Sequence, residues 1–159
     1  MLKIVTDSTS DLPLKLTQEL DIAVVPLYVH FGQEVFRDGI DIAADDFYQR
    51  LASSPVFPTT SAPGPGVFAE AYKGLVDQGH QVISIHISSK LSATHQAAVT
   101  ASQDFDSSKV TVVDSQSVSL GLGLMVMAAA RAATEGQSLE QVVAQVEGAI
   151  SRGHTLFVL

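Results

Sequence analysis

The chain has 159 residues, no cysteine and a formal net charge of −8. A chain of this length is one ordinary domain, and the absence of cysteine excludes disulfides and thiolate metal sites. Its nine basic residues are scattered singly, which excludes the clustered basic face that nucleic-acid-binding proteins need.

The start of the chain, MLKIVTDS, lacks the long apolar core of a secretory signal. The most apolar window, residues 118–130, is too short to cross a bilayer and fits a buried helix. We therefore expect a cytoplasmic protein with no transmembrane segment.

The first third of the chain alternates short apolar runs with polar turns. Pro13 is placed to open a helix, with Asp11 or Leu12 at its cap, and Pro26 interrupts a strand region. Apolar periodicity and turn residues predict, in order, a strand over 2–6, a helix over 14–20, a strand region over 22–31, an antiparallel ribbon with 34–37, and a helix over 45–51.

Residues 58–68, PTTSAPGPGVF, combine three prolines and two glycines, which constrain or free the backbone, with three hydroxyl side chains. Thr59, Thr60 and Ser61 offer three hydroxyls in a predicted loop, and Pro65 suits the first position of a helix. Unpaired N–H groups at a helix N-terminus favour a carboxylate or phosphate ligand. A proline-rich turn with hydroxyl caps would have the same pattern, and this stretch alone leaves both readings open.

The rest of the chain continues to alternate strand and helix. Two hydroxyl-rich segments, residues 88–92 and 114–119, directly follow predicted strands. The predicted elements are a strand over 81–87, a helix of small residues over 93–101, a strand over 109–113, an apolar helix over 120–133, a capping-box helix from Ser138 to Gly153, and a strand over 155–159.

This alternation predicts an α/β fold with a mostly parallel sheet covered on both faces. Ligands of such sheets gather at the carboxyl ends of the strands. Here those ends are Asp7 with Ser8, residues 88–92 and residues 114–119, and the loop at 59–61 is placed to join them. We found no internal repeat or linker, so no internal domain boundary is expected.

Catalytic signatures are missing from the sequence. There is no GxSxG elbow and no Walker loop, so we expect no enzyme, no cofactor and no metal site. Asp7 and Asp114, at strand ends, are predicted to organise loops by accepting backbone N–H bonds. No two of the five histidines are four apart on one helix; only His86 and His95 are candidates to line the site.

Four blocks, KIVTDSTSDLP, TTSAPGPGVF, ISSKLSATHQAA and VVDSQSVSLGLG, follow one another along the chain. In order and spacing they resemble the N-terminal half of the DegV family of bacterial fatty-acid-binding proteins, over essentially all 159 residues. The resemblance implies a three-layer α/β/α domain. It also implies a second domain, absent from this chain, that helps to enclose a long acyl tail.

The resemblance further implies a ligand site for the fatty-acid carboxylate. Thr60 and Ser92 would donate hydroxyl hydrogen bonds and Ala93 its N–H, and the loaded protein would be presented to a fatty-acid kinase that makes acyl phosphate. Ala93 stands where the family usually has glycine, which allows positive φ or close approach of a headgroup. The full predicted ligand-binding set is Thr60, Ser61, Ser92, Ala93, Thr59, Ser8, His95 and Ser119.

Burial of the acyl tail is expected to dominate affinity. A hydrogen bond to a charged group contributes about 1.5–3 kcal/mol, whereas a long tail offers on the order of 10 kcal/mol at about 0.8 kcal/mol per CH₂. We therefore expect weak binding unless a second domain or a homodimer partner covers the tail.

Two alternative hypotheses assign the chain to other functional classes. One is a small phosphorylated-metabolite or sugar-binding domain related to dihydroxyacetone-kinase-like units, which a polar cleft without an apolar tunnel would favour. The other is an interaction module that docks on a kinase and self-associates through an exposed apolar face, which concentration-dependent sedimentation would support.

Overall fold

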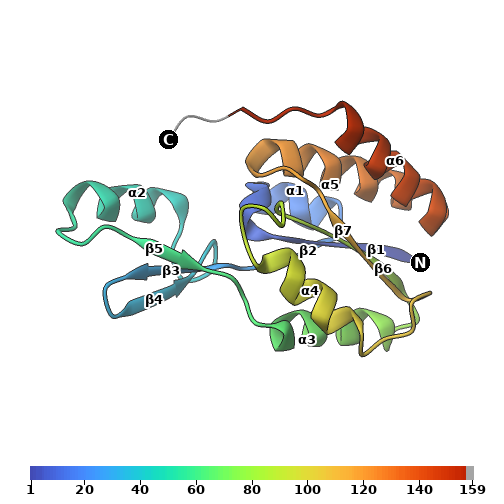
Figure 1. Cartoon of the computed structure of the whole chain (residues 1–159), viewed down its shortest axis with the longest axis horizontal. Helices are drawn as coiled ribbons and strands as arrows, with labels where there is room; N and C mark the ends of the chain where they lie inside the picture. The colour runs from blue at the N-terminus through green and yellow to red at the C-terminus, as the bar shows by residue number, and fades with distance from the viewer. Residues whose placement is uncertain (157–159) are drawn as a thin grey trace.

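The computed structural model of the chain describes residues 1–156, and these form two sheets (Figure 1). The larger sheet is parallel, with strand order β2-β1-β6-β7, and the smaller is antiparallel, with order β4-β3-β5. We call residues 28–61, which hold the smaller sheet and one helix, the arm, and the remainder the body.

Every element of the body lies in or against the parallel sheet. Its strands are β1 (Leu2–Asp7), β2 (Ile22–Val25), β6 (Gln81–His86) and β7 (Val110–Asp114). Its helices are the 3₁₀ turn η1 (Ser8–Ser10), α1 (Leu14–Glu19), α3 (Pro65–Val76), α4 (Thr94–Ser102), α5 (Ser119–Thr134) and α6 (Leu139–Arg152).

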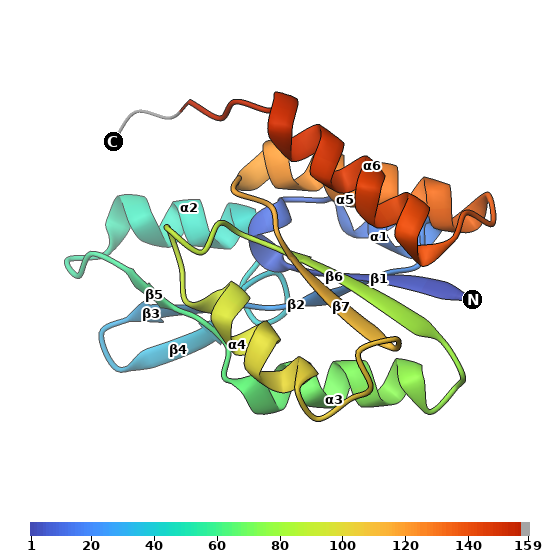
Figure 2. The same cartoon turned by 45° about the vertical axis from the view of Figure 1, so that its right-hand side comes forward.

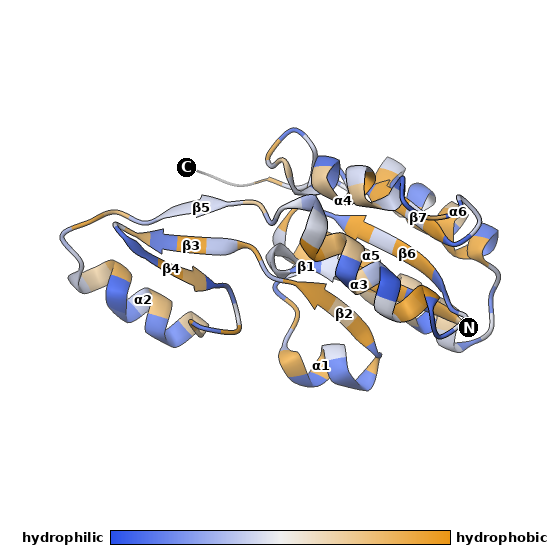
Figure 3. Ribbon diagram, turned by 90° about the horizontal axis from the view of Figure 1, so that it is seen from below, coloured by the Kyte–Doolittle hydropathy of each residue, from blue (hydrophilic) through white to orange (hydrophobic). Residues whose placement is uncertain are grey.

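The body has three layers, with α5 and α6 on one face of the sheet and α3 and α4 on the other (Figure 1). Neighbouring strand residues point to opposite faces, so Ile4 packs with Leu122 of α5 while Val5 packs with Phe68 of α3. The strands are apolar along most of their length because both faces are covered (Figure 3). The predicted α/β fold is confirmed.

A close approach fixes α5 against the turn that follows β1. A Cβ added at Gly123 would lie 2.5 Å from the carbonyl oxygen of Ser10 and 3.1 Å from Leu12 Cδ2. Glycine at this position therefore allows the helix to contact η1, at the carboxyl edge of the sheet.

The arm has its own small core. It consists of β3 (Tyr28–Phe31), β4 (Glu34–Arg37), α2 (Ala44–Ser53) and β5 (Thr59–Ser61). Val29, Phe31 and Ile42 are buried, and Phe47 of the amphipathic helix α2 packs against them. The ribbon predicted from Gly32-Gln33 is confirmed, and Gly32 has the positive φ, +63°, that such a turn favours.

Several sequence predictions were wrong in detail. The predicted loop at 59–61 is the edge strand β5, because its backbone pairs with β3. The strand region at 22–31 divides at Pro26 into strands of two different sheets. The helix predicted over 14–20 is present as α1, but its N-cap is Pro13 rather than Asp11 or Leu12. Thr155 and Leu156 are exposed and form no strand, and the rest of the strand predicted over 155–159 lies outside the described residues.

Candidate functional site

The three strand-end segments of the body meet at one edge of the sheet. The N–H of Ser88 donates to the carbonyl of Ser117 at 2.9 Å, and the N–H of Ser115 donates to the carbonyl of His86 at 3.1 Å. Asp114 accepts the N–H of Ser89 at 3.2 Å. The prediction that these hydroxyl-rich segments converge is therefore confirmed for the segments that follow β1, β6 and β7.

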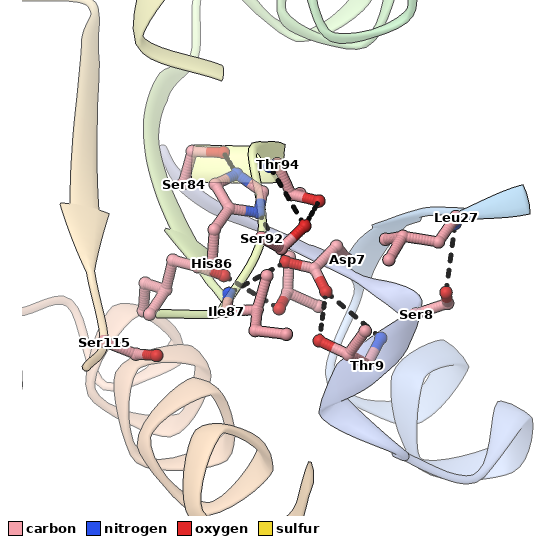
Figure 4. A network of polar contacts seen from close by, with 12 residues as sticks. Asp7, Ser8, Thr9, Leu27, Ser84, His86, Ile87, Ser92, Thr94 and Ser115 are labelled. Atoms are coloured by element: carbon pink, nitrogen blue, oxygen red, sulfur yellow. Dashed lines mark hydrogen bonds and ion pairs between the residues drawn. The ribbon is translucent and has the colours of Figure 1, made fainter. Parts of the chain in front are cut away.

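Asp7 is the centre of this edge (Figure 4). Its Oδ1 accepts the N–H of Thr9 at 3.1 Å and the hydroxyl of the same residue. Its Oδ2 accepts the N–H of Ile87 at 3.0 Å and bonds His86 Nδ1 at 2.9 Å. Burial by itself raises the pKa of Asp7, but the bonds from His86, Thr9 and Ile87 outweigh burial, so the pKa lies below its usual value.

A line of buried polar side chains continues from Asp7 through His86 to Ser84 (Figure 4) and then to Tyr72 of α3. His86 Nε2 lies 2.6 Å from Ser84 Oγ, and the hydroxyl of Tyr72 donates to the same oxygen at 2.8 Å. All four side chains are fully buried. The sequence analysis did not identify Ser84 or Tyr72. A usable signal existed for Ser84, because Ser84 and His86 are polar residues two apart in an apolar strand and therefore point to the same face.

Ser84, His86 and Asp7 have the residue types of a nucleophilic triad. However, Ser84 is fully buried and its oxygen already accepts the Tyr72 hydroxyl. The Ser84 hydroxyl is therefore not accessible to a substrate in this structure.

The loop between β6 and α4 carries Ser92 and Ala93. Ser92 Oγ accepts the N–H of Thr94 at 3.2 Å and lies 2.8 Å from Thr94 Oγ1. Thr94 is fully buried, and a buried hydroxyl proton needs an acceptor, so we assign Thr94 as the donor. The hydroxyl proton of Ser92 is then free to bond a ligand.

Ala93 adopts φ −74° and ψ −2°, so this position does not need glycine for its backbone conformation. The N–H groups of Ala93 and His95 donate to no other group within residues 1–156. Together with the Ser92 hydroxyl they form a set of donors at the start of α4, which is suited to an anion.

The three hydroxyls of β5 do not point the same way. Thr60 pairs with Val29, and residues paired across antiparallel strands share a face, so Thr60 lies on the face that α2 covers. Thr59 and Ser61 lie on the opposite face, where Ser61 Oγ is 2.8 Å from His30 Nε2. The C-terminal end of β5 runs beside the loop that leads into α4 (Figures 1 and 2).

The other predicted site residues have separate roles at the same edge. Ser8 Oγ accepts the N–H of Leu27 at 3.1 Å and so ties η1 to the chain entering the arm. His95 is half-buried, and burial lowers its pKa against the opposing effect of Asp114. Ser119 begins α5 with φ +54°, a left-handed conformation that is unusual outside glycine.

A cavity of about 950 Å³ lies between the arm and the body, next to α1 and α2. Its lining combines apolar side chains with carboxylates and hydroxyls, and Ser8 is the one predicted site residue among them. Representative lining residues are Asp11, Leu14, Asp38, Ile40 and Tyr48.

No helix between residues 1 and 156 combines the length and the apolar character that a membrane span requires. Over the same range, no three histidine or acidic side chains lie close enough together to hold a metal ion.

Comparison with known proteins gives a consistent result. The family model described as "uncharacterised protein, DegV family" matches residues 1–159. A DegV domain-containing protein of Clostridium perfringens is 40% identical over 145 residues, which are 91% of this chain and 52% of that protein.

Two solved structures are similar over the same region. A DegV family protein from Thermus thermophilus, described as fatty-acid binding, is 45% identical with a TM-score of 0.87, over 94% of this chain and 53% of that one. A stearic-acid-binding protein from Eubacterium ventriosum is 32% identical with a TM-score of 0.85, over 92% and 52%. The chain thus spans about half the length of the relatives it matches.

Proposed function

Because the chain belongs to the DegV family, we propose that it binds a long-chain fatty acid, with the carboxylate between Thr60 and Ser92. The relatives from Thermus thermophilus and Eubacterium ventriosum, described as binding fatty acid and stearic acid, support this ligand class. The observation that carries the proposal for this chain is the donor set at the start of α4.

This donor set suits a carboxylate in a protein of net charge −8. Ser92 can donate its hydroxyl proton outward, and the N–H groups of Ala93 and His95 have no partner within residues 1–156. Neutral donors and the positive end of a helix bind an anion without an arginine clamp. The alanine at 93 is compatible with this role, because its φ is negative.

Thr60 supplies the opposite side of the site. It is exposed, lies on the α2 face of the arm, and belongs to the strand that runs beside the α4 loop. Thr59 and Ser61 face away from it, so they contribute less to carboxylate binding than Thr60. Because side chains along β5 alternate between two faces, Thr60 is the one of its three hydroxyl residues that faces α2.

We propose that the chain is a non-catalytic carrier that presents its fatty acid to a fatty-acid kinase. The exposure of Thr60 supports this role, because a partner can reach the carboxylate and convert it to an acyl phosphate. Most of the affinity would come from covering the tail, at about 0.8 kcal/mol per CH₂. A second copy of the chain is one candidate cover, and sedimentation with and without stearate tests it.

The test is organic extraction of the purified protein and mass spectrometry, followed by titration with stearate. We expect Thr60→Val and Ser92→Ala each to weaken stearate binding by roughly tenfold, since each loses a hydrogen bond to a charged group. Thr59→Val and Ser61→Ala are matched controls on the opposite face of β5 and should change binding less than about twofold.

Two results would contradict the proposal. Equal losses in all four variants would show that Thr60 and Ser92 do not form the site. A wild-type chain that binds inorganic phosphate or a sugar phosphate but not stearate would favour the phosphorylated-metabolite reading, because the same donors suit a phosphate.

A further inference from the structure

The buried line of side chains at the sheet edge has a definite hydrogen-bond direction. Asp7 has a pKa below its usual value, so at neutral pH its carboxylate only accepts hydrogen bonds. His86 must therefore donate from Nδ1 to Asp7 Oδ2. Ser84 Oγ accepts the Tyr72 hydroxyl, and the buried hydroxyl proton of Ser84 itself needs an acceptor, which His86 Nε2 provides.

The Tyr72 hydroxyl, the Ser84 hydroxyl and the His86 Nδ1–H each have one acceptor along this line. These three side chains and Asp7 are all fully buried. If any member turned away, a buried donor or acceptor would lose its partner, and no water at the surface could replace it. The line is therefore a fixed connection between the groups at its two ends.

Those two ends belong to the two sides of the proposed carboxylate site. Tyr72 lies on α3, the helix that follows the strand carrying Thr60. Asp7 holds the N–H of Ile87, at the start of the loop that carries Ser92. Phe68, one turn before Tyr72 in α3, also packs on the His86 ring, edge to face, with 5.0 Å between ring centroids.

We propose that His86 is a positioning residue that sets the spacing between Thr60 and Ser92. It contacts α3 directly at Phe68 and is linked to Tyr72 of α3 through Ser84. It is linked to the start of the Ser92 loop through Asp7, which bonds the N–H of Ile87. This role rests on the proposed function, because it concerns how the same two hydroxyls are held for a carboxylate. No contact between His86 and the ligand is involved.

Three variants divide the line at different points. His86→Leu removes both polar contacts of the ring. His86→Asn places an amide near the position of Nδ1, so it can keep the bond to Asp7 while losing the one to Ser84. Tyr72→Phe removes only the hydroxyl at the far end and is the variant least expected to impair folding.

Thr6→Val is the matched control. Thr6 is fully buried, and its hydroxyl donates to the carbonyl of Ile85 at 2.8 Å, so the control removes a bond between β1 and β6 without touching the line. Valine has nearly the shape of threonine. Any general loss of stability from a buried hydrogen bond in these strands is therefore present in the control.

The first readout is hydrogen exchange of the ligand-free protein. Relative to Thr6→Val, we expect His86→Leu to speed exchange by about tenfold in both residues 59–68 and residues 88–96, as for loss of about one hydrogen bond. His86→Asn should restore protection in 88–96 but not in 59–68, and Tyr72→Phe should loosen 59–68 alone. Exchange in both segments that matches the control would overturn the proposal.

The second readout is the ratio of affinities for stearate and stearyl alcohol, which share a tail and differ in charge. A positioning role predicts that His86→Leu lowers this ratio by about tenfold, with little change in affinity for the alcohol. General destabilisation would weaken both ligands together, which would overturn the proposal. A wild type that binds neither ligand would refute the proposed function itself, whereas stearate binding with an unchanged ratio in the variants would refute only the role of His86.

Discussion

Two histidine–serine pairs in this molecule have similar geometry and opposite surroundings. In the body, His86 Nε2 lies 2.6 Å from Ser84 Oγ and both side chains are fully buried. In the arm, His30 Nε2 lies 2.8 Å from Ser61 Oγ at the exposed surface. Water can replace either partner in the arm but neither partner in the body, so only the body pair should be important for stability.

This difference in exposure distinguishes side chains that hold the fold from side chains that a ligand can reach. The buried pair belongs to a line in which every donor has an acceptor, and it holds the carboxyl edge of the sheet in one arrangement. The hydroxyls of β5 are exposed, which leaves them available to a ligand. The pair in the body thus supports the fold, whereas the hydroxyls of β5 in the arm stay exposed.

The largest expected effect comes from breaking the buried line at its charged end. Asp7→Ala leaves the His86 and Ile87 N–H groups and the Thr9 donors without their acceptor, and we expect it to lower the free energy of unfolding by about 3–5 kcal/mol. Urea unfolding measures this loss. The free energy of unfolding of Asp7→Asn should lie between those of the wild type and Asp7→Ala. A loss below about 1 kcal/mol for Asp7→Ala would contradict the central role of Asp7 at this edge.

Ser84→Ala should have the next largest effect. It removes the acceptor of the Tyr72 hydroxyl and the donor to His86 Nε2, so two buried groups lose their partners. We expect a loss of about 2–3 kcal/mol in the free energy of unfolding, again measured in urea. The double variant Ser84→Ala with Tyr72→Phe should recover part of this loss, because the unpaired hydroxyl is then gone.

Acid should weaken the body in a way that Asp7 controls. Because the folded pKa of Asp7 lies below its ordinary value of 3.8, its contribution to stability is complete above that value and is lost as the pH falls below it. We expect a smaller effect than for Asp7→Ala, since a protonated carboxyl still accepts hydrogen bonds. Unfolding free energies from pH 5 to pH 2 should fall less steeply in Asp7→Asn, and parallel slopes in the two proteins would contradict this assignment.

The smallest effect is expected in the arm. Ser61→Ala makes the same chemical change as Ser84→Ala beside a histidine, yet the free energy of unfolding should stay within about 0.5 kcal/mol of the wild type, because the site is exposed. Similar losses in the free energy of unfolding of Ser61→Ala and Ser84→Ala, measured in urea, would show that burial does not distinguish the two pairs.

Local patterns in the sequence determined much of this structure. The capping box at Ser138 is confirmed, with both of its hydrogen bonds to Gln141 present, because such caps depend on residues three apart. Asp7 and Asp114 were predicted to bind backbone N–H groups near them, and both do so. The convergence of strand-end segments followed from strand–helix alternation, since parallel strands bring their carboxyl ends to one edge.

Contacts between distant residues could be decided only by the tertiary structure. Asp7 and His86 are 79 residues apart, and Tyr72 reaches Ser84 only because α3 packs on that face of the sheet. The arm forms a separate sheet, and Thr59–Ser61 form a strand, because their backbone pairs with the edge of β3 that β4 leaves open. That pairing register then placed Thr60 on one face and its two neighbours on the other, a choice that rests on long-range hydrogen bonds rather than on the three hydroxyl residues themselves.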